Sequence, residues 1–343
     1  MFQLDPLQDP RWRAFIQTHP DASVFHHVEW LQALKSYYGY APVALTLTPP
    51  GSPLENGLVY CEVRSLLTGD RIVSIPFSDH CEPLTSDPEE LQFFLAHLKE
   101  RVEKNGWNYF ELRPIFHSPD DNNGLGVSQN YYVHRLDLRP SEQTLLRKFH
   151  KHSVQRKIRR AEREGLHYEQ GNSEVLLQHF YKLMVMTRRH QGLPPQPLKW
   201  FRAVLSCMGG NAQVWVAFKG ATPVASMLTL TSRKSLVYKY GCSDSNFTNL
   251  GGTVLLFWNA IQQAKAIRLD ELDMGRSDIA NTGLITFKEH WGAERIAVNY
   301  WRYPLRAASS NPERLIRYVK RLISVAPDQA LVVLGNLLYR HVG

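Results

Sequence analysis

The chain has 343 residues, 43% of them hydrophobic, so it can bury a substantial core, and its length is typical of two domains rather than one. No apolar run approaches the ~20 residues that a membrane-spanning helix needs, and residues 1–15 lack the apolar core of a signal peptide. Basic residues outnumber acidic residues by 40 to 32, a formal charge of +8 that favours acidic partners. We therefore expect a cytoplasmic protein.

In the first half of the chain the residue pattern predicts a helix, three strands, a second helix and two more strands. The second helix, residues 86–106, should begin with a capping box formed by Ser86 and Glu89. The other helix covers residues 26–39, and the strands cover residues 42–48, 57–67, 71–77, 107–114 and 131–138.

The second half repeats this layout. Helices are predicted over residues 141–164, 174–190, 198–208 and 253–266, with a short helix within 283–294, and strands over 166–170, 213–219, 223–231, 235–243, 268–275 and 295–303. Helices that alternate with runs of strands indicate an α/β or α+β protein with helices layered on sheets. Residues 96–114 and 259–276 also resemble each other, which suggests two related domains. We expect domains at 1–140 and 141–305, followed by a helical tail at 306–343.

The tail has an amphipathic pattern. Its apolar stripe consists of Leu315, Ile316, Val319, Leu322 and Ile323, and its basic side chains are Arg314, Arg317, Lys320 and Arg321. Such a helix can pack on the body of the protein, or it can lie on an anionic membrane surface. The second alternative would place the protein peripherally at the inner face of a membrane.

The densest basic segment is residues 147–165. Residues three and four apart share a helix face, so Arg156, Arg159, Arg160 and Arg163 should form a positive ridge. A polyanion such as tRNA would fit this ridge, and a solvated face with ordinary ion pairs is the alternative. No base-reading motif accompanies the charge, so a specific DNA site is not expected.

A glycine-containing turn joins a predicted strand to a predicted helix. The strand ends at Tyr240-Gly241, and the helix begins after Gly251 at Gly252-Thr253. The free backbone N–H groups and the positive dipole end of such a helix suit a pyrophosphate. Glycine also serves turns that need only tight geometry, so the pattern alone does not decide the function.

Charged residues cluster near the end of the strand 268–275 and in the helix that follows. Asp273, Arg276 and Ser277 should lie at or just beyond the carboxyl end of this strand, where open α/β sheets bind ligands. Asp273 could act as a general base, or it could form a structural ion pair with Arg276. Lys288 could neutralise a phosphate or a developing anion.

The four cysteines lie far apart. Cys61, Cys81, Cys207 and Cys242 show neither C-x-x-C spacing nor histidines at metal-ligand intervals. The sequence therefore predicts free thiols and no bound metal.

Four of these segments occur in a recognisable order and spacing. They read "RKIRRAEREG", "YGCSDSNFTNLGGTVLLFWNAI", "LDMGRSD" and "GLITFKEHWGAE". Over residues 145–305 the chain resembles the acetyltransferase-like domain of FemAB-related proteins, a branch of the GNAT superfamily. More weakly, "FHHVEWLQAL" and "IPFSDHCEPL" resemble the N-terminal domain of FemAB-related proteins encoded with exopolysaccharide and exosortase systems. The resemblance implies tandem GNAT-like domains, each a mixed sheet with a V-shaped gap between strands.

The resemblance also implies an activity. It predicts an N-acyltransferase that moves an acyl or aminoacyl group from acyl-CoA or aminoacyl-tRNA to an amine on a lipid-linked or other anionic cell-envelope or exopolysaccharide precursor. Lys288 matches the lysine of an F-K-x-x-x-G segment that lies near the phosphates of the acceptor in the family. The loop "NFTNLGGT" lacks the cation that ordinary GNAT pyrophosphate loops carry at their first position. The alternative is a catalytically silent relative that holds an anionic carrier or a membrane within a polysaccharide assembly complex.

Overall fold

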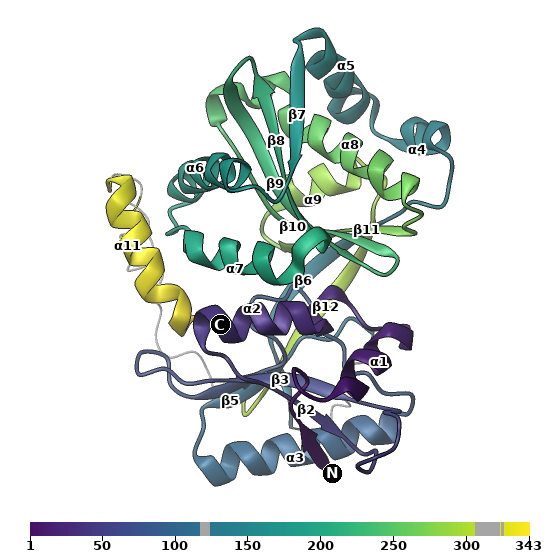
Figure 1. Ribbon diagram of the computed structural model, residues 1–343, viewed down its shortest axis with the longest axis vertical. Coiled ribbons are helices and arrows are strands. Elements are labelled where there is room, and N and C mark those ends of the chain that lie inside the picture. Colours follow the sequence, from purple (N-terminus) through teal and green to yellow (C-terminus); the bar gives the residue numbers. More distant parts are fainter. Residues whose placement is uncertain (117–123, 306–322, 324–325) are drawn as a thin grey trace. The chain divides into compact units, whose positions relative to one another are not determined.

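The structure is a computed structural model that describes residues 1–116, 124–305, 323 and 326–343 (Figure 1). Its internal contacts divide the chain into two compact units. Of the described residues, the first unit contains 1–116, 124–131, 297–305 and 338–343, and the second contains 132–296, 323 and 326–337. The sequence predicts two continuous domains, with boundaries at residues 140 and 305. Each unit of the structure instead combines separate stretches of the chain, so these boundaries stay predictions.

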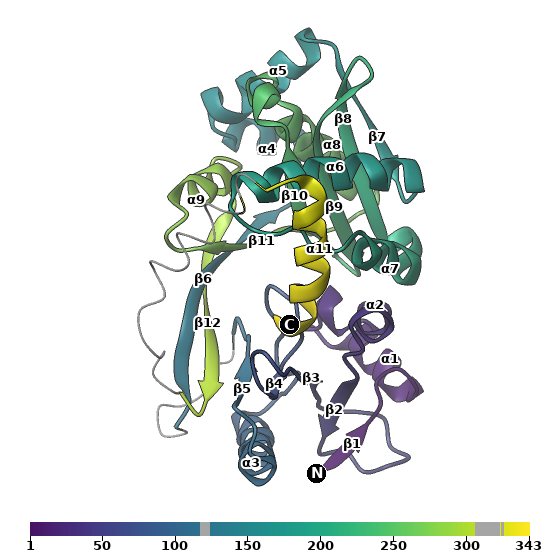
Figure 2. The same cartoon turned by 90° about the vertical axis from the view of Figure 1, so that its left-hand side faces the viewer.

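The first unit is a mixed sheet with helices on both faces. Its strands follow the order β1-β2-β3-β4-β5-β12, in which β4 and β5 are parallel and the other described pairs are antiparallel. The strands are β1 (Phe2–Leu4), β2 (Pro42–Thr46), β3 (Leu58–Val63), β4 (Arg71–Val73), β5 (Tyr109–Leu112) and β12 (Glu294–Tyr303), of which residues 297–303 belong to this unit. Helix α3 (Pro88–Asn105) covers one face, and α1 (Pro10–Thr18) and α2 (Val28–Tyr38) cover the other (Figures 1 and 2).

The beginning of α3 differs from the prediction. The cap is Asp87, whose side chain accepts a hydrogen bond from the Glu89 backbone N–H at 2.8 Å, and Pro88 occupies the first helical position. The expected capping box between Ser86 and Glu89 is therefore wrong. The backbone N–H of Ser86 donates instead to the Glu90 carboxylate at 3.0 Å.

The second unit is also a mixed sheet flanked by helices, as predicted. Its order is β6-β11-β10-β9-β8-β7, with β10 and β11 parallel and the pairs from β10 to β7 antiparallel. The strands are β7 (Leu166–Gly171), β8 (Ala212–Lys219), β9 (Thr222–Ser232), β10 (Ser235–Ser243), β11 (Glu271–Asp278) and β6 (Gly126–Asp137), of which only residues 132–137 belong to this unit. Helices α6 (Glu174–His190) and α7 (Leu198–Met208) lie on one face, and α8 (Gly252–Ala266) lies on the other (Figure 1).

The predicted single helix over residues 141–164 is wrong. The structure has α4 (Glu142–Lys148), a π-helical turn (Lys151–Gln155) and α5 (Arg156–Arg163). The break occurs because Phe149 adopts an extended conformation that buries its ring against Trp258 and Trp291. The next residue, His150, then caps the new turn, since its Nδ1 accepts from the Ser153 N–H at 3.1 Å.

The predicted amphipathic stripe of the tail lies outside the described residues except for Ile323, which is buried. The structure describes a later helix, α11 (Asp328–Leu338), in which Asp328 pairs with Arg189 of α6. None of the helices in the described part of the chain is long and apolar enough to cross a membrane.

The last residues of the chain belong to the first unit. The hydroxyl of Tyr40 donates to the Arg340 carbonyl at 2.7 Å, and the buried guanidinium of Arg71 donates to the carbonyls of His341 and Gly343, both at 2.8 Å. These bonds fasten residues 338–343 beside the β3–β4 connection.

Candidate functional site

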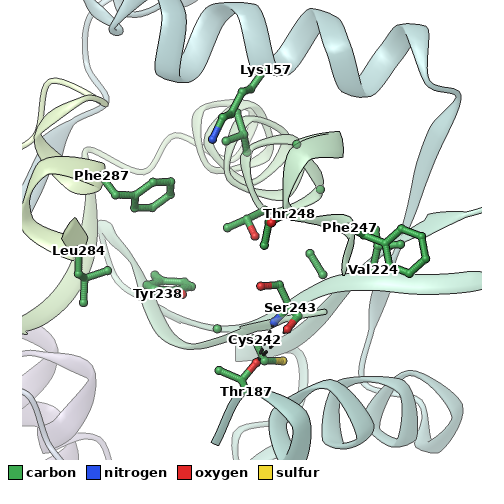
Figure 3. A pocket seen from close by; sticks show the side chains of 16 residues that line it. Lys157, Thr187, Val224, Tyr238, Cys242, Ser243, Phe247, Thr248, Leu284 and Phe287 are labelled. Carbon is green, nitrogen blue, oxygen red and sulfur yellow. Dashed lines mark hydrogen bonds between the residues drawn. The ribbon is translucent and has the colours of Figure 1, made fainter. Parts of the chain in front are cut away.

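A cavity of about 280 Å³ lies at the N-terminal end of α8 in the second unit (Figure 3). Strands β9 and β10, the 3-10 turn Ser245–Leu250, the first turn of α8, helix α9 (Thr282–Glu289) and one residue of α5 form its walls. The cavity therefore lies where the sequence predicts a pyrophosphate site.

The cavity exists because two parallel strands separate. The described ladder between β10 and β11 covers only residues 235–237 and 271–273, whereas β10 stays paired with β9 as far as Ser243. A register shift between Tyr238 and Tyr240 accompanies the separation. Beyond Val237, where the described ladder to β11 ends, Tyr238, Gly241, Cys242 and Ser243 of β10 line the cavity. A strand that leaves its neighbour can offer backbone N–H and C=O groups to a bound molecule.

The first turn of α8 supplies backbone N–H donors. Gly251 precedes the helix with a φ of 88°, and none of the described side chains caps the helix. The N–H groups of the first turn have no partner within a helix, and the helix dipole adds partial positive charge at the same end. Gly251, Gly252 and Thr253, all predicted from the sequence, line the cavity. Their arrangement suits an anionic group such as a phosphate.

Lys157 is the residue that the sequence analysis missed. It is exposed on α5, lines the cavity and directs its ammonium group into it (Figure 3). Burial of Ile158 and Ala161 fixes the orientation of α5 and leaves Lys157 toward the cavity. A Cβ atom on Gly251 would lie 2.8 Å from the Lys157 carbonyl oxygen, so the glycine permits this close approach.

The two predicted arginines of the same helix do not line the cavity. Arg156 is exposed, and Arg160 lies 3.8 Å from Glu164 in an i,i+4 ion pair. Their predicted role in binding a polyanion concerns the outer face of α5 and stays a prediction. The signal that would have identified Lys157 is the position of the helix break at Phe149, which sets which face of α5 is buried.

Tyr238 brings a hydroxyl group to the cavity. Its ring packs on Phe257 with centroids 4.6 Å apart, and its hydroxyl occupies the space that a Cβ atom on Gly241 would need. Burial raises the pKa of Tyr238, so the phenol stays protonated at neutral pH, and its hydroxyl can donate or accept a hydrogen bond. The neighbouring Tyr240, predicted from the sequence, does not line the cavity, since its hydroxyl accepts hydrogen bonds from Gln196 and Trp200.

Asp273 is buried within β11 rather than beyond its end. Its side chain is 3% exposed, and Oδ1 accepts from the Gly275 N–H at 2.7 Å. Gly275 has a φ of 69°, which bends the strand at this point. Arg276 is exposed and Ser277 is 1% exposed. None of these four residues lines the cavity, and the predicted role of Asp273 as a general base stays a prediction.

Lys288 is also buried, with 1% of its surface exposed. Its ammonium donates to the carbonyl oxygens of Gly275 at 2.6 Å and Arg276 at 3.2 Å. The side chain therefore supports the bend of β11 from α9. Its predicted contact with the phosphates of an acceptor stays a prediction, since the structure directs the ammonium to the protein's own backbone.

His134 of β6 completes this buried charged group. Its side chain is fully buried, and its ring nitrogens have no hydrogen-bond partner among the described residues. Burial and, to a smaller extent, the charges of Lys288 and Arg295 lower the pKa of His134 to about 4, while the charge of Asp273 opposes them. The imidazole is thus neutral at pH 7. Among the described residues, no group of three histidine, cysteine or acidic side chains could hold a metal ion.

Comparison with known proteins identifies the segment that forms the cavity. Residues 148–289 match the family model described as "Acetyltransferase (GNAT) domain". The chain carries a GNAT domain. This match confirms the superfamily that the four sequence segments indicate.

Solved structures extend the likeness beyond the GNAT domain. The crystal structure of FemX is similar at 13% identity, with a TM-score of 0.69 over 93% of this chain and 100% of that chain. A tandem GNAT protein from the clavulanic acid biosynthesis pathway matches at 9% identity with a TM-score of 0.55, over 90% of this chain and 98% of that one. L-PGS from Bacillus licheniformis matches at 15% identity with a TM-score of 0.50, over 78% and 86%. The fold is that of a FemX-like, tandem GNAT protein, as predicted.

A search of curated proteins found no match to the chain.

Proposed function

We propose that this protein is an N-acyltransferase that moves an acyl or aminoacyl group from acyl-CoA or aminoacyl-tRNA to an amine on a cell-envelope or exopolysaccharide precursor. The observation that carries the proposal is the cavity at the N-terminus of α8, inside the GNAT domain. Both donors join a phosphate-bearing carrier to an activated carbonyl group. The cavity offers a site for each of these two parts.

The phosphate-binding part combines the first turn of α8 with Lys157. Gly251, Gly252 and Thr253 line the cavity at the start of α8, and the Lys157 side chain enters it from α5 (Figure 3). Lys157 supplies the positive charge that the loop "NFTNLGGT" lacks at its first position. We infer that in this protein Lys157 of α5 takes the role of the cation that ordinary GNAT proteins carry in the loop.

The carbonyl-binding part lies along β10 beyond Val237, where Gly241, Cys242 and Ser243 line the cavity. Backbone N–H groups there can hold the carbonyl oxygen and stabilise the negative charge that forms on it during attack. The acceptor amine forms a bond to the carbonyl carbon, while the bond to the thiol sulfur or the ribose oxygen of the carrier breaks. The proton that the amine loses is taken up by the leaving sulfur or oxygen, and the Tyr238 hydroxyl in the cavity wall can relay it by accepting one proton and donating another. Correct placement of the two reactants can lower the barrier by about 7–11 kcal/mol.

The similar proteins support the donor side of the proposal. The clavulanic acid pathway protein is described as free of AcCoA, which links a tandem GNAT fold to an acetyl thioester. The acceptor side rests on the likeness to FemX and on the sequence resemblance to FemAB-related proteins. An anionic or lipid-linked acceptor would match the positive charge of the chain.

The test is a transfer assay. The protein is incubated with acetyl-CoA or charged tRNA and with amino sugars, and products are detected by a gain in mass. Turnover with either donor supports the proposal. Binding of a donor without any transfer would favour the silent carrier-binding alternative, and neither binding nor transfer would refute both.

Substitution of Thr253 separates the donor site from folding. Thr253→Glu places a carboxylate in the first turn of α8, where it stabilises a helix by about 0.3–1 kcal/mol. The same carboxylate repels an anionic donor, so we expect donor affinity to fall at least about tenfold while stability is unchanged or higher. The control is Thr253→Gln, which has the same size without the charge. Equal donor affinity in the two variants would contradict a phosphate site at this turn.

A further inference from the structure

Two adjacent leucines are exposed in a turn of the first unit. Leu66 is fully exposed and Leu67 is 67% exposed, and both belong to the β3–β4 turn, residues 64–70. Surface turns are usually built from glycine, proline and small polar residues, because these suit tight backbone geometry. Two leucines at such a position leave apolar surface in water. Folding of the unit does not bury either side chain.

Hydrogen bonds hold the backbone of this turn. The N–H groups of Leu67 and Thr68 donate to the Ser65 hydroxyl at 3.2 and 3.0 Å, and the Gly69 N–H donates to the Ser65 carbonyl at 2.8 Å. The Thr68 hydroxyl donates to the His341 carbonyl at 2.8 Å. These backbone donors need no water, so the turn can enter a water-poor environment without losing their partners.

Basic side chains lie beside the leucines. A cavity of about 750 Å³ is lined by Leu66 and by the cations Arg64 and Arg340. Its two acidic residues, Glu62 and Asp70, already accept from other groups of the unit, an arginine of α3 and the backbone of the turn. Glu62 also lies 3.7 Å from Arg64, farther than it lies from the arginine of α3. Both Arg64 and Arg340 are exposed, so an anion can reach their charges beside Leu66.

Apolar side chains beside cations are typical of a protein surface that meets an anionic membrane. The apolar groups enter the boundary between headgroups and acyl chains, and the cations bind the lipid phosphates. A stable protein–protein interface buries roughly 800 Å² on each partner, far more than two leucine side chains expose. We propose that the first unit docks on an anionic lipid bilayer, with Leu66 and Leu67 inserted at its surface and Arg64 and Arg340 on lipid phosphates. This surface shares no residue with the donor cavity, so the inference does not depend on the proposed function.

Two different forces contribute to this docking. Burial of a leucine side chain is worth about tenfold in affinity or more. An arginine near an anionic lipid surface is worth about fivefold. Salt screens the contribution of the arginines and leaves that of the leucines. Docking should therefore depend on both the anionic lipid and the apolar side chains.

The experiment is cosedimentation of the full chain with lipid vesicles. One set of vesicles contains phosphatidylcholine and phosphatidylglycerol in equal amounts, and the other contains phosphatidylcholine alone. We expect wild type to bind the first set more tightly, and added salt to weaken that binding. The double variant Leu66→Ser/Leu67→Ser should bind the first set at least about tenfold more weakly. Arg64→Gln and Arg340→Gln should each weaken it about fivefold.

The matched controls lie in the second unit. Val175→Ser combined with Ile267→Ser removes two exposed apolar side chains, and Lys199→Gln removes one exposed positive charge. Both controls should bind as wild type does, and circular dichroism checks that all variants are folded.

Three outcomes would overturn the docking surface and leave the proposed function intact. The first is absence of wild-type binding to both sets of vesicles. The second is unchanged binding by the leucine double variant, which would assign the membrane contact to another part of the chain. The third is equal losses in the variants and their controls.

Discussion

Lys288→Met tests whether the buried ammonium of α9 is a structural support of β11. The wild-type ammonium donates to the carbonyls of Gly275 and Arg276 inside the protein. Methionine keeps most of the side-chain volume but leaves both carbonyls without this donor. We therefore expect the second unit to lose stability even though no cavity is created.

The magnitude follows from two opposing effects. Hydrogen bonds from a charged group are worth about 1.5–3 kcal/mol each, so the loss of two could reach about 6 kcal/mol. Part of this is regained, because the buried ammonium no longer has to be desolvated. A net destabilisation of about 2–4 kcal/mol remains. The pKa of His134 should also rise from about 4 in the folded variant, since Lys288 is one of the charges that lower it.

Urea unfolding measures the stability, and an NMR titration of His134 measures its pKa. The matched control is Lys265→Met, because the Lys265 ammonium also donates to two backbone carbonyls, those of Leu138 and Pro140, but is only half-buried. Water can replace that ammonium, so we expect a loss below about 1 kcal/mol. Equal losses for the two variants, or an unchanged His134, would refute the structural role. A stable Lys288→Met protein that no longer uses its acceptor would instead support the phosphate contact expected from the sequence.

Three further predictions concern buried groups. Glu111→Gln should lower the free energy of unfolding by about 3 kcal/mol, because the buried Glu111 carboxylate lies 2.6 Å from the Arg302 guanidinium and 3.0 Å from that of Arg113. An unchanged midpoint of urea unfolding would contradict this. Burial lowers the pKa of His26 to about 4, so stability should fall as the pH drops from 6.5 toward 4, by at most about 3 kcal/mol. His26→Gln should flatten that profile between pH 7 and 5, and an equally steep profile would exclude His26 as the cause. Gly251→Ala should lower the free energy of unfolding by about 1–3 kcal/mol and weaken donor binding, since φ is 88° and the added Cβ would lie 2.8 Å from the Lys157 carbonyl oxygen. Differential scanning calorimetry measures the stability, and an unchanged value would show that the turn relaxes around the added Cβ.

Much of the second unit could be predicted because its local patterns agree with its tertiary packing. Helices α6 and α7 have the bounds that their apolar spacing indicates, 174–190 and 198–208. Gly251 and Gly252 mark the cavity for a local reason as well, since a left-handed turn ahead of an uncapped helix has a sequence signature.

The residues that could not be predicted depend on contacts between distant segments. Lys157 faces the cavity only because Phe149 interrupts the basic helix to reach Trp258 and Trp291, more than a hundred positions away. Lys288 looks like an exposed lysine in its own segment, and its burial depends on the bend of β11 at Gly275. Neither the separation of β10 from β11 nor the position of that bend leaves a periodic pattern in the sequence.

The composition of the first unit bears on how the protein is made. Residues 1–131 leave the ribosome early, yet this unit also needs residues 297–303 for β12 and residues 338–343 for the bonds to Tyr40 and Arg71. Residues 1–131 therefore cannot complete their sheet until the GNAT domain, which lies between the two segments in sequence, has been translated. Until then, the edge of the sheet that pairs with β12 stays unpaired. During this interval the unpaired sheet edge can aggregate. Residues 1–131 are thus translated before the GNAT domain, but their unit completes its fold after that domain has been translated.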